Sequence, residues 1–214
     1  METTSPRICF YITGFGKFGT VIENPTSILV NKIADLFKEC AFPLNVTLEY
    51  SKVVEVTITA LKQAVHEIND KIKAQATPSK NIILHFGVSA GSPCFSLEQY
   101  GYNIAHFSIP DNEGNQPKSV CIIDTLDFKK PLETKMDLKN IQCMADPSRC
   151  KISSNPGTYI CNYTYLYSMH VNCSETVLFV HFPSFTTICE KDQACFVTNL
   201  LKAIVKDTLA SPKC

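Results

Sequence analysis

Residues 155–170 read Asn-Pro-Gly-Thr-Tyr-Ile-Cys-Asn-Tyr-Thr-Tyr-Leu-Tyr-Ser-Met-His. The first three residues interrupt regular structure, and the aromatic and aliphatic run behind them is long enough for three or four helical turns. This order is typical of a helix start. Cys161 is then expected in or near the first turn, where the positive end of the helix dipole stabilises a thiolate. The stretch therefore predicts a helix that presents a nucleophilic sulfur near its N-terminus.

A second reactive group follows roughly twenty residues later. Residues 176–183 read Thr-Val-Leu-Phe-Val-His-Phe-Pro, which is typical of a buried strand with His181 near its carboxyl end. Open α/β sheets place their functional residues at that end of the strands. A cysteine at a helix start and a histidine at a strand end are the parts of a cysteine hydrolase. A chain with eleven cysteines can also offer such a pair by chance.

Strand-like and helix-like segments alternate along most of the chain. Runs of β-branched and aromatic residues predict strands, and apolar residues three and four apart predict amphipathic helices. This alternation predicts the α/β class, as a three-layer α/β/α sandwich around a mixed, mostly parallel twisted sheet. With 214 residues and 45% hydrophobic side chains, we expect one domain over residues 1–214. Besides the segments above, the expected strands are residues 7–13, 46–56, 81–86, 95–103, 120–123 and 150–153, and the expected helices are residues 24–40, 57–74, 138–145 and 192–209.

Charge and composition exclude several classes of partner. Twenty basic residues balance twenty acidic ones, so neither nucleic acid nor an anionic membrane is an expected partner. No apolar run approaches the ~18 residues that span a bilayer. The first residues, Met-Glu-Thr-Thr-Ser-Pro-Arg, lack the basic and apolar regions of a signal peptide. The expected location is cytoplasmic.

The cysteines do not form a recognisable metal or disulfide pattern. Their number is odd, no CxxC occurs, and no short paired spacing indicates zinc. We expect reduced thiols that serve mostly as small core residues. Disulfides between Cys143 and Cys150, or between Cys189 and Cys195, are the alternative. Neither a metal nor a cofactor is expected.

Two other segments resemble ligand sites only in part. Asp111 and Glu113 lie in a polar turn, residues 109–117, that lacks the other ligands of a calcium loop. The glycines of residues 14–19 follow a strand but match neither phosphate-loop spacing. Phe15 and Phe18 within that loop favour an apolar ligand wall, with simple cover of the core as an equal alternative.

Glu98 is a candidate third member of a catalytic triad. It lies in a half-apolar strand, where burying a carboxylate is costly unless the carboxylate is paired. A Glu98 that points into the pocket would orient His181. The alternative is an outward-facing strand glutamate. His85, inside residues 81–86, is expected to be a core histidine.

Several blocks of the sequence together resemble one known family, the pyroglutamyl peptidases of type I, also called pyrrolidone-carboxylate peptidases. They occur in the family order and span nearly the whole chain. The blocks are Thr13–Gly19 with Asn24–Thr26, then Gly87–Asn103, Ile109–Pro117, Gly157–Asn162 and Phe179–Pro183.

This resemblance implies a cysteine-type exopeptidase that hydrolytically removes an N-terminal pyroglutamyl residue from peptides through a thioester. Its partners would be peptides with an N-terminal pyroglutamate, and a homo-oligomer is possible. Carried over residue by residue, Cys161 matches the nucleophile, His181 the base and Glu98 the residue that orients it. The expected substrate contacts are Phe15, Phe18 and Val88.

Some positions depart from the family pattern, and two other function classes stay open. Lys17, Thr20, Ser108 and Pro156 replace residues that are common in the family, which bears on affinity, rate and thermal stability rather than on the chemistry. A catalytically inactive binding protein on the same fold is one alternative. A phosphorylase-like α/β enzyme is the other, although no recognisable set of phosphate-binding Arg and Ser residues is present.

Overall fold

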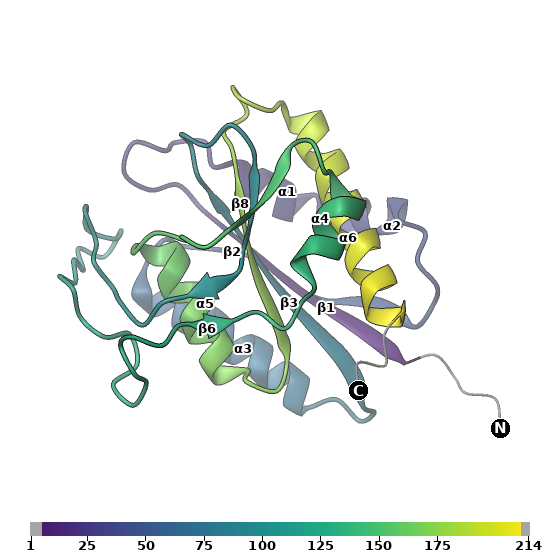
Figure 1. Cartoon of the computed structure of the whole chain (residues 1–214), viewed down its shortest axis with the longest axis horizontal. Coiled ribbons are helices and arrows are strands. Elements are labelled where there is room, and N and C mark those ends of the chain that lie inside the picture. Colours follow the sequence, from purple (N-terminus) through teal and green to yellow (C-terminus); the bar gives the residue numbers. More distant parts are fainter. Residues whose placement is uncertain (1–5, 211–214) are drawn as a thin grey trace.

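A six-stranded twisted sheet forms the centre of the computed structural model, which describes residues 6–210 (Figure 1). Its strands are β1 (Arg7–Phe15), β2 (Val46–Val54), β3 (Ser79–Val88), β4 (Phe95–Glu98), β7 (Cys150–Ser153) and β8 (Thr176–Phe182). They lie in the order β2-β1-β3-β8-β4-β7. All neighbours pair in parallel except β4 and β8, which are antiparallel. The predicted mixed, mostly parallel sheet is confirmed.

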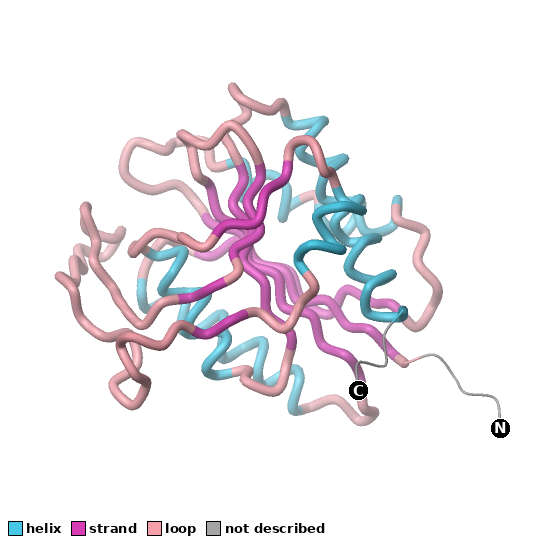
Figure 2. The backbone as a smooth tube through the Cα atoms, in the orientation of Figure 1, coloured by secondary structure: helices cyan, strands magenta, loops and turns pink. Residues whose placement is uncertain are grey.

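Helices cover both faces of this sheet (Figures 1 and 2). One face carries α3 (Ile58–Lys73) and α5 (Ile160–Val171), whose apolar residues share a buried cluster with alternate residues of the strands. The other face carries α1 (Pro25–Asn31), α2 (Ile33–Glu39), α4 (Leu138–Ala145) and α6 (Glu190–Ala210), which share the second cluster. The three-layer α/β/α architecture is therefore confirmed. The central strands are buried on both sides, which explains their continuous apolar runs.

A long stretch between residues 102 and 131 contains neither helix nor strand and lies beside α5 (Figure 2). It is preceded by β5 (Tyr100–Gly101), which pairs with β6 (Leu132–Glu133) in a separate two-stranded sheet. The predicted strand at residues 95–103 is thus divided into β4 and β5. After β4 the chain leaves the central sheet, and β5 pairs with β6 instead.

The predicted strand at residues 120–123 is wrong. Only Val120 pairs, in a single bridge with Ala105. The side chain of Asn103, 1% exposed, accepts two backbone N–H groups of this segment at 2.9 Å each. A side chain that satisfies backbone donors in this way replaces a strand partner.

Local capping explains where the helices begin. Asn24 accepts the N–H of Thr26, and Pro25 is the first residue of α1. Thr57 caps α3 in the same way. The single helix predicted for residues 24–40 is wrong, because it is divided at Lys32, whose N–H donates to two carbonyls of the preceding turn. Such shared hydrogen bonds are common where a helix ends.

His85 is a core residue, as predicted. It is 1% exposed, and its Nδ1 lies 2.7 Å from the hydroxyl of Thr13 on the neighbouring strand. Burial lowers the pKa of His85 to about 3, because the imidazolium would be desolvated. The neutral side chain is therefore part of the structure at physiological pH.

Residues 6–210 include no helix long and apolar enough to cross a membrane. The ten cysteines in the described part of the chain are free thiols, and Cys214 lies outside it. The prediction that most cysteines fill the core is wrong for these ten. Three are buried and five are exposed, because they lie on loops and outer helix faces.

Close contact between α1 and β1 depends on Gly14. A Cβ placed at Gly14 would lie 2.5 Å from the backbone oxygen of Thr26 and 2.8 Å from a methyl group of Val30. We expect Gly14→Ala to lower the free energy of unfolding by about 1–3 kcal/mol, because the helix must shift to admit the methyl group. Denaturant unfolding measures this. Gly91→Ala is the matched control, since nothing lies within 4 Å of its Cβ; equal stability of the two variants would contradict the packing argument.

Candidate active site

A cleft of about 500 Å³ opens at the carboxyl ends of β3 and β8, where the sequence predicted the functional residues. Cys161, His181 and Glu98 all line it. They come from a helix start and from two neighbouring strands that are far apart in sequence. The structure therefore brings the three predicted catalytic side chains together.

Cys161 is the second residue of α5, at the helix start that the sequence predicted. The residue before the helix, Tyr159, makes no side-chain capping bond, so its side chain leaves the N–H groups of the first turn of α5 uncapped. The buried side chain of Asn162 holds this turn in place. It accepts the N–H of Tyr102 at 2.8 Å and donates to the carbonyls of Tyr102 and Ile104.

Gly87 makes room for the sulfur. A Cβ on this β3 residue would lie 3.0 Å from Cys161 Sγ and 2.6 Å from the ring of Phe179. A side chain at this position would therefore displace the Cys161 sulfur or the Phe179 ring. The sequence analysis named Gly87 only as the start of a family block, because the contact that requires a glycine here is with segments far away in the chain.

His181 and Glu98 form a buried pair. His181 Nδ1 lies 2.8 Å from Glu98 Oε1, and the two residues are 8% and 1% exposed. The backbone carbonyl of Glu98 accepts the hydroxyl of Tyr165 at 2.8 Å, which anchors β4 to α5. The second carboxylate oxygen, Oε2, is buried with no partner among the described residues.

The charge state of His181 follows from its neighbours. Burial alone would lower the pKa of His181, but interactions with Cys161 and with the Glu98 carboxylate outweigh burial and raise it to about 9. The protonated imidazole is therefore favoured at neutral pH. An imidazolium beside Cys161 is the arrangement that stabilises a thiolate.

Of the expected substrate contacts, Phe18 and Val88 line the cleft. The Phe18 ring lies 5.9 Å from the ring of Tyr159, a second aromatic wall residue that the sequence did not identify. Phe15 is 3% exposed and is absent from the cleft lining, and its ring lies 6.4 Å from the ring of Phe179. Its role as a substrate contact stays a prediction.

The segment 109–117 supports this aromatic wall. The carbonyl of Pro110 accepts the hydroxyl of Tyr159, and the side chain of Asn112 donates to the carbonyl of Lys17. Asp111 is occupied by backbone N–H groups, including that of Ile58. Burial opposes its charge, but these donors hold the pKa of Asp111 below its usual range. Segment 109–117 thus connects the loop that contains Phe18 to the segment that leads into α5.

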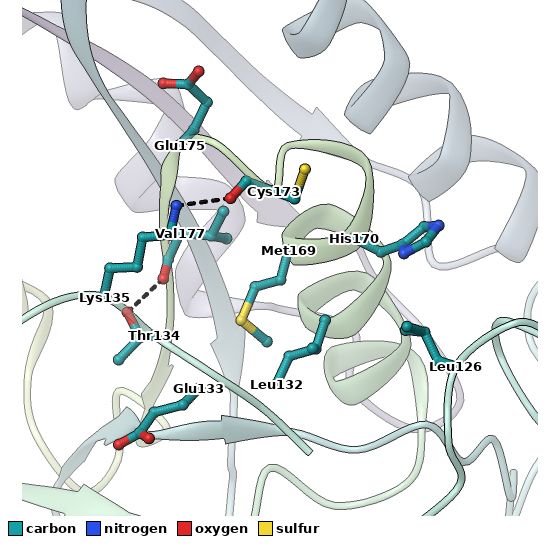
Figure 3. Close-up of a pocket in the computed structure, with 10 residues that line it drawn as sticks. All are labelled: Leu126, Leu132, Glu133, Thr134, Lys135, Met169, His170, Cys173, Glu175 and Val177. Carbon is teal, nitrogen blue, oxygen red and sulfur yellow. Dashed lines mark hydrogen bonds between the residues drawn. The ribbon is translucent and has the colours of Figure 1, made fainter. Parts of the chain in front are cut away.

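A second hollow lies at the opposite end of β8 and contains another cysteine and histidine, Cys173 and His170 (Figure 3). Their side chains point in different directions, and neither the sulfur nor the imidazole is hydrogen-bonded to the other. The nearby Lys135 donates to the backbone carbonyl of Cys173. Because this hollow lacks a paired nucleophile and base, the Cys161 cleft is the candidate active site.

Two proteins with sequences similar to this chain are peptidases of the same kind. The human pyroglutamyl-peptidase 1 is 27% identical over 209 residues, covering 95% of this chain and 91% of that protein. A pyrrolidone-carboxylate peptidase from Bacillus cereus is 27% identical over 161 residues, covering 74% of this chain and 68% of that protein.

Solved structures show the same fold. A mutant pyrrolidone carboxyl peptidase from Pyrococcus furiosus superposes with a TM-score of 0.80 at 20% identity, covering 94% of this chain and all of that one. The pyrrolidone carboxyl peptidase from Thermococcus litoralis gives 0.78 at 20% identity, with 94% of each chain covered. The model of the family described as pyroglutamyl peptidase matches residues 9–206, so the chain belongs to the pyroglutamyl peptidase family.

Proposed function

We propose that this protein is a cysteine-type exopeptidase that removes an N-terminal pyroglutamyl residue from peptides. Family membership supports the activity. The observation that carries the mechanism is the buried hydrogen bond between Glu98 and His181, beside Cys161 in an open cleft. Nucleophile, base and orienting group are the three parts that covalent acyl transfer requires.

In the proposed reaction, the Cys161 thiolate attacks the carbonyl carbon that joins pyroglutamate to the next residue. The carbon–nitrogen bond breaks as His181 donates its proton to the leaving amine, and a thioester remains on Cys161. Neutral His181 then takes a proton from water, whose oxygen attacks the thioester. Pyroglutamate leaves, and the thiolate and imidazolium are restored. Glu98 keeps the imidazole ring oriented and stabilises its positive charge.

The developing negative charge on the carbonyl oxygen needs hydrogen-bond donors. We assign this role to the free N–H groups of the first turn of α5, because the side chain of Tyr159 caps none of them. Residues 87–91, where β3 ends, are the alternative source of donors, and Val88, Ser89 and Gly91 among them line the cleft. Donors aimed at this oxygen act most strongly in the transition state.

The lining of the cleft suits a neutral lactam. Pyroglutamate has no ammonium group, so its site requires no free carboxylate. Glu98 is the one acidic residue that lines the cleft in the described part of the chain, and its charge is already paired with His181. Phe18, Tyr159 and Val88 supply the apolar wall that a lactam ring favours.

The two other function classes receive no comparable support. Membership of the pyroglutamyl peptidase family does not favour a phosphorylase. An inactive binding protein would have no need of a buried charged pair beside a cysteine, and a turnover assay separates the two cases. We also propose a cytoplasmic location, which suits the five exposed free thiols; a homo-oligomer is compatible with this proposal.

Replacement of the nucleophile tests the proposal directly. We expect Cys161→Ser to reduce turnover of a fluorogenic pyroglutamyl amide by roughly a thousandfold or more, because a serine hydroxyl is a much weaker nucleophile at this site. His181→Ala should be comparably severe, and Glu98→Gln severe or intermediate. Thiol alkylation should abolish the activity of the unmodified protein.

Cys173→Ser is the matched control, because Cys173 is exposed and lines the second hollow. It should retain the activity of the unmodified protein and the same melting temperature. Near-normal activity in Cys161→Ser, or its loss in Cys173→Ser, would contradict the assignment.

The pH dependence should follow the charge on His181. Because its pKa is raised to about 9, the imidazolium persists through neutral pH, and kcat/KM should fall only as the pH rises through about 9. In Glu98→Gln the carboxylate no longer raises this pKa while burial still lowers it, so the alkaline limb should move to lower pH. Rate profiles from neutral to alkaline pH measure the shift; an unmoved alkaline limb would contradict the role of Glu98.

The aromatic wall gives a paired prediction. We expect Phe18→Ala to reduce kcat/KM by roughly ten- to a hundredfold, because an aromatic contact with the bound ring is worth about 1.5–3 kcal/mol. Its stability should change little, since Phe18 is only half-buried. Phe15→Ala should instead lower the free energy of unfolding by about 3–5 kcal/mol, because its ring is buried. Loss of activity without loss of stability in Phe15→Ala would instead support the predicted role of Phe15 as a substrate contact.

A further inference from the structure

The cleft has two chemically different ends. Phe18, in the loop after β1, lies beside Tyr159, and these two rings form the aromatic end. Lys151 and Ser153 on β7, with Asn155 after it, form a polar end, because β1 and β7 lie on opposite sides of β8 in the strand order. Cys161 and His181 lie along the same cleft. The polar end is contributed by β7, the edge strand of the sheet, and by the turn that follows it.

Strand register fixes the position of Lys151 relative to the catalytic groups. Ser96 on β4 pairs with His181 on one side and with Lys151 on the other. Residues paired across neighbouring strands point to the same face of a sheet. Lys151 therefore lies in a row with Ser96 and His181, two strand spacings or roughly 10 Å from the catalytic histidine. All three line the cleft.

The ammonium group of Lys151 forms no ion pair with another described residue. Lys151 is exposed, and no carboxylate among residues 6–210 lies within ion-pair distance of it. The other charged groups that line the cleft, Glu98 and His181, are paired with each other. The neighbouring Arg149 points elsewhere and pairs with Asp146 and Asp192. Lys151 is thus the one unpaired cation among the described residues that line the cleft.

The direction of the substrate follows from its chemistry. A pyroglutamyl residue is the first residue of its peptide, so nothing extends beyond the lactam ring at the aromatic end. The rest of the peptide must leave the scissile bond toward the other end of the cleft. An extended chain advances by roughly 3.4 Å per residue, which brings the side chain or the terminal carboxylate of the next one or two residues within reach of the Lys151 ammonium.

We propose that Lys151 forms a subsite that selects a carboxylate on the leaving-group side of the scissile bond. This inference rests on the proposed function, because it takes the lactam to occupy the aromatic end. The carboxylate belongs either to an acidic side chain directly after pyroglutamate or to the C-terminus of a short peptide. Opposite charges here accelerate productive encounter and stabilise the bound peptide, and a cationic residue at the same place is disfavoured.

The test compares kcat/KM for three pyroglutamyl dipeptide amides, with glutamate, alanine or lysine as the second residue. A fourth substrate, pyroglutamyl-alanine with a free carboxylate, separates the two sources of charge. Each value is expressed relative to the alanine amide. The proteins are the unmodified chain, Lys151→Met, Lys151→Glu and the control Lys139→Glu. Lys139 is exposed on α4 and is absent from the cleft lining, so its replacement makes the same change in net charge elsewhere.

The unmodified protein should prefer a carboxylate-bearing substrate over the lysine amide. Lys151→Glu should lower the ratio of kcat/KM for the carboxylate-bearing substrate to kcat/KM for the lysine amide by about tenfold. The variant loses the attraction to the carboxylate and gains one to the lysine side chain, and each exposed ion pair contributes up to about fivefold. Lys151→Met should fall between them, Lys139→Glu should keep the original ratio, and added salt should compress the preference. Melting temperatures confirm that each variant is folded.

The outcomes separate this proposal from the proposed function. If the unmodified protein cleaves none of the four substrates, the proposed function itself fails and this inference falls with it. If it cleaves them and Lys151→Glu leaves both carboxylate ratios unchanged, only the Lys151 subsite is overturned. A response confined to the glutamate amide assigns the subsite to a side chain, and a response confined to the free acid assigns it to the peptide terminus.

Discussion

The hydrogen bond between Glu98 and His181 is the constraint on which the site depends. Taking a carboxylate out of water costs several kcal/mol unless a partner compensates for it, and Glu98 is 1% exposed. Its partner is 83 positions away in sequence, on a strand that must lie directly beside it. The antiparallel insertion of β4 next to β8 provides that neighbour within an otherwise parallel sheet. The hydrogen bond between Glu98 and His181 therefore depends on the position of β4 in the sheet.

Close packing around this pair explains several residues that carry no chemistry. Gly87 leaves space for the Cys161 sulfur and the Phe179 ring, and Asn162 holds the first turn of α5 against the irregular segment after β5. The segment 109–117 connects the Phe18 loop to Tyr159 through hydrogen bonds. A site built from a helix start, two strand ends and a loop needs such contacts, because small displacements of reacting groups cost much of the rate.

The difference between the two ends of the cleft gives the site a direction. The aromatic end offers contact area and no free charge, which suits a neutral ring that ends the peptide. The polar end carries the unpaired ammonium of Lys151, which we propose meets the remainder of the substrate. In the proposed function, recognition of the first residue and discrimination between leaving groups are separated in space, and Cys161 and His181 line the same cleft.

Local sequence determined the type of most elements and indicated the candidate reactive residues. The breakers before Cys161, the capping residues Asn24 and Thr57, and the apolar run around His181 act over a few positions, so their consequences could be predicted. The family resemblance added Glu98, whose strand pattern alone left an outward-facing side chain as an alternative. Tertiary structure alone decided that Glu98 points at His181, that Phe15 is buried whereas Phe18 is not, and that Lys151 lies in register with Ser96. It also decided that residues 120–123 satisfy their backbone through Asn103 rather than through a strand. The physical reason is that strand pairing and side-chain packing join segments far apart in the chain, where the periodicity of any one segment carries no information about its neighbour.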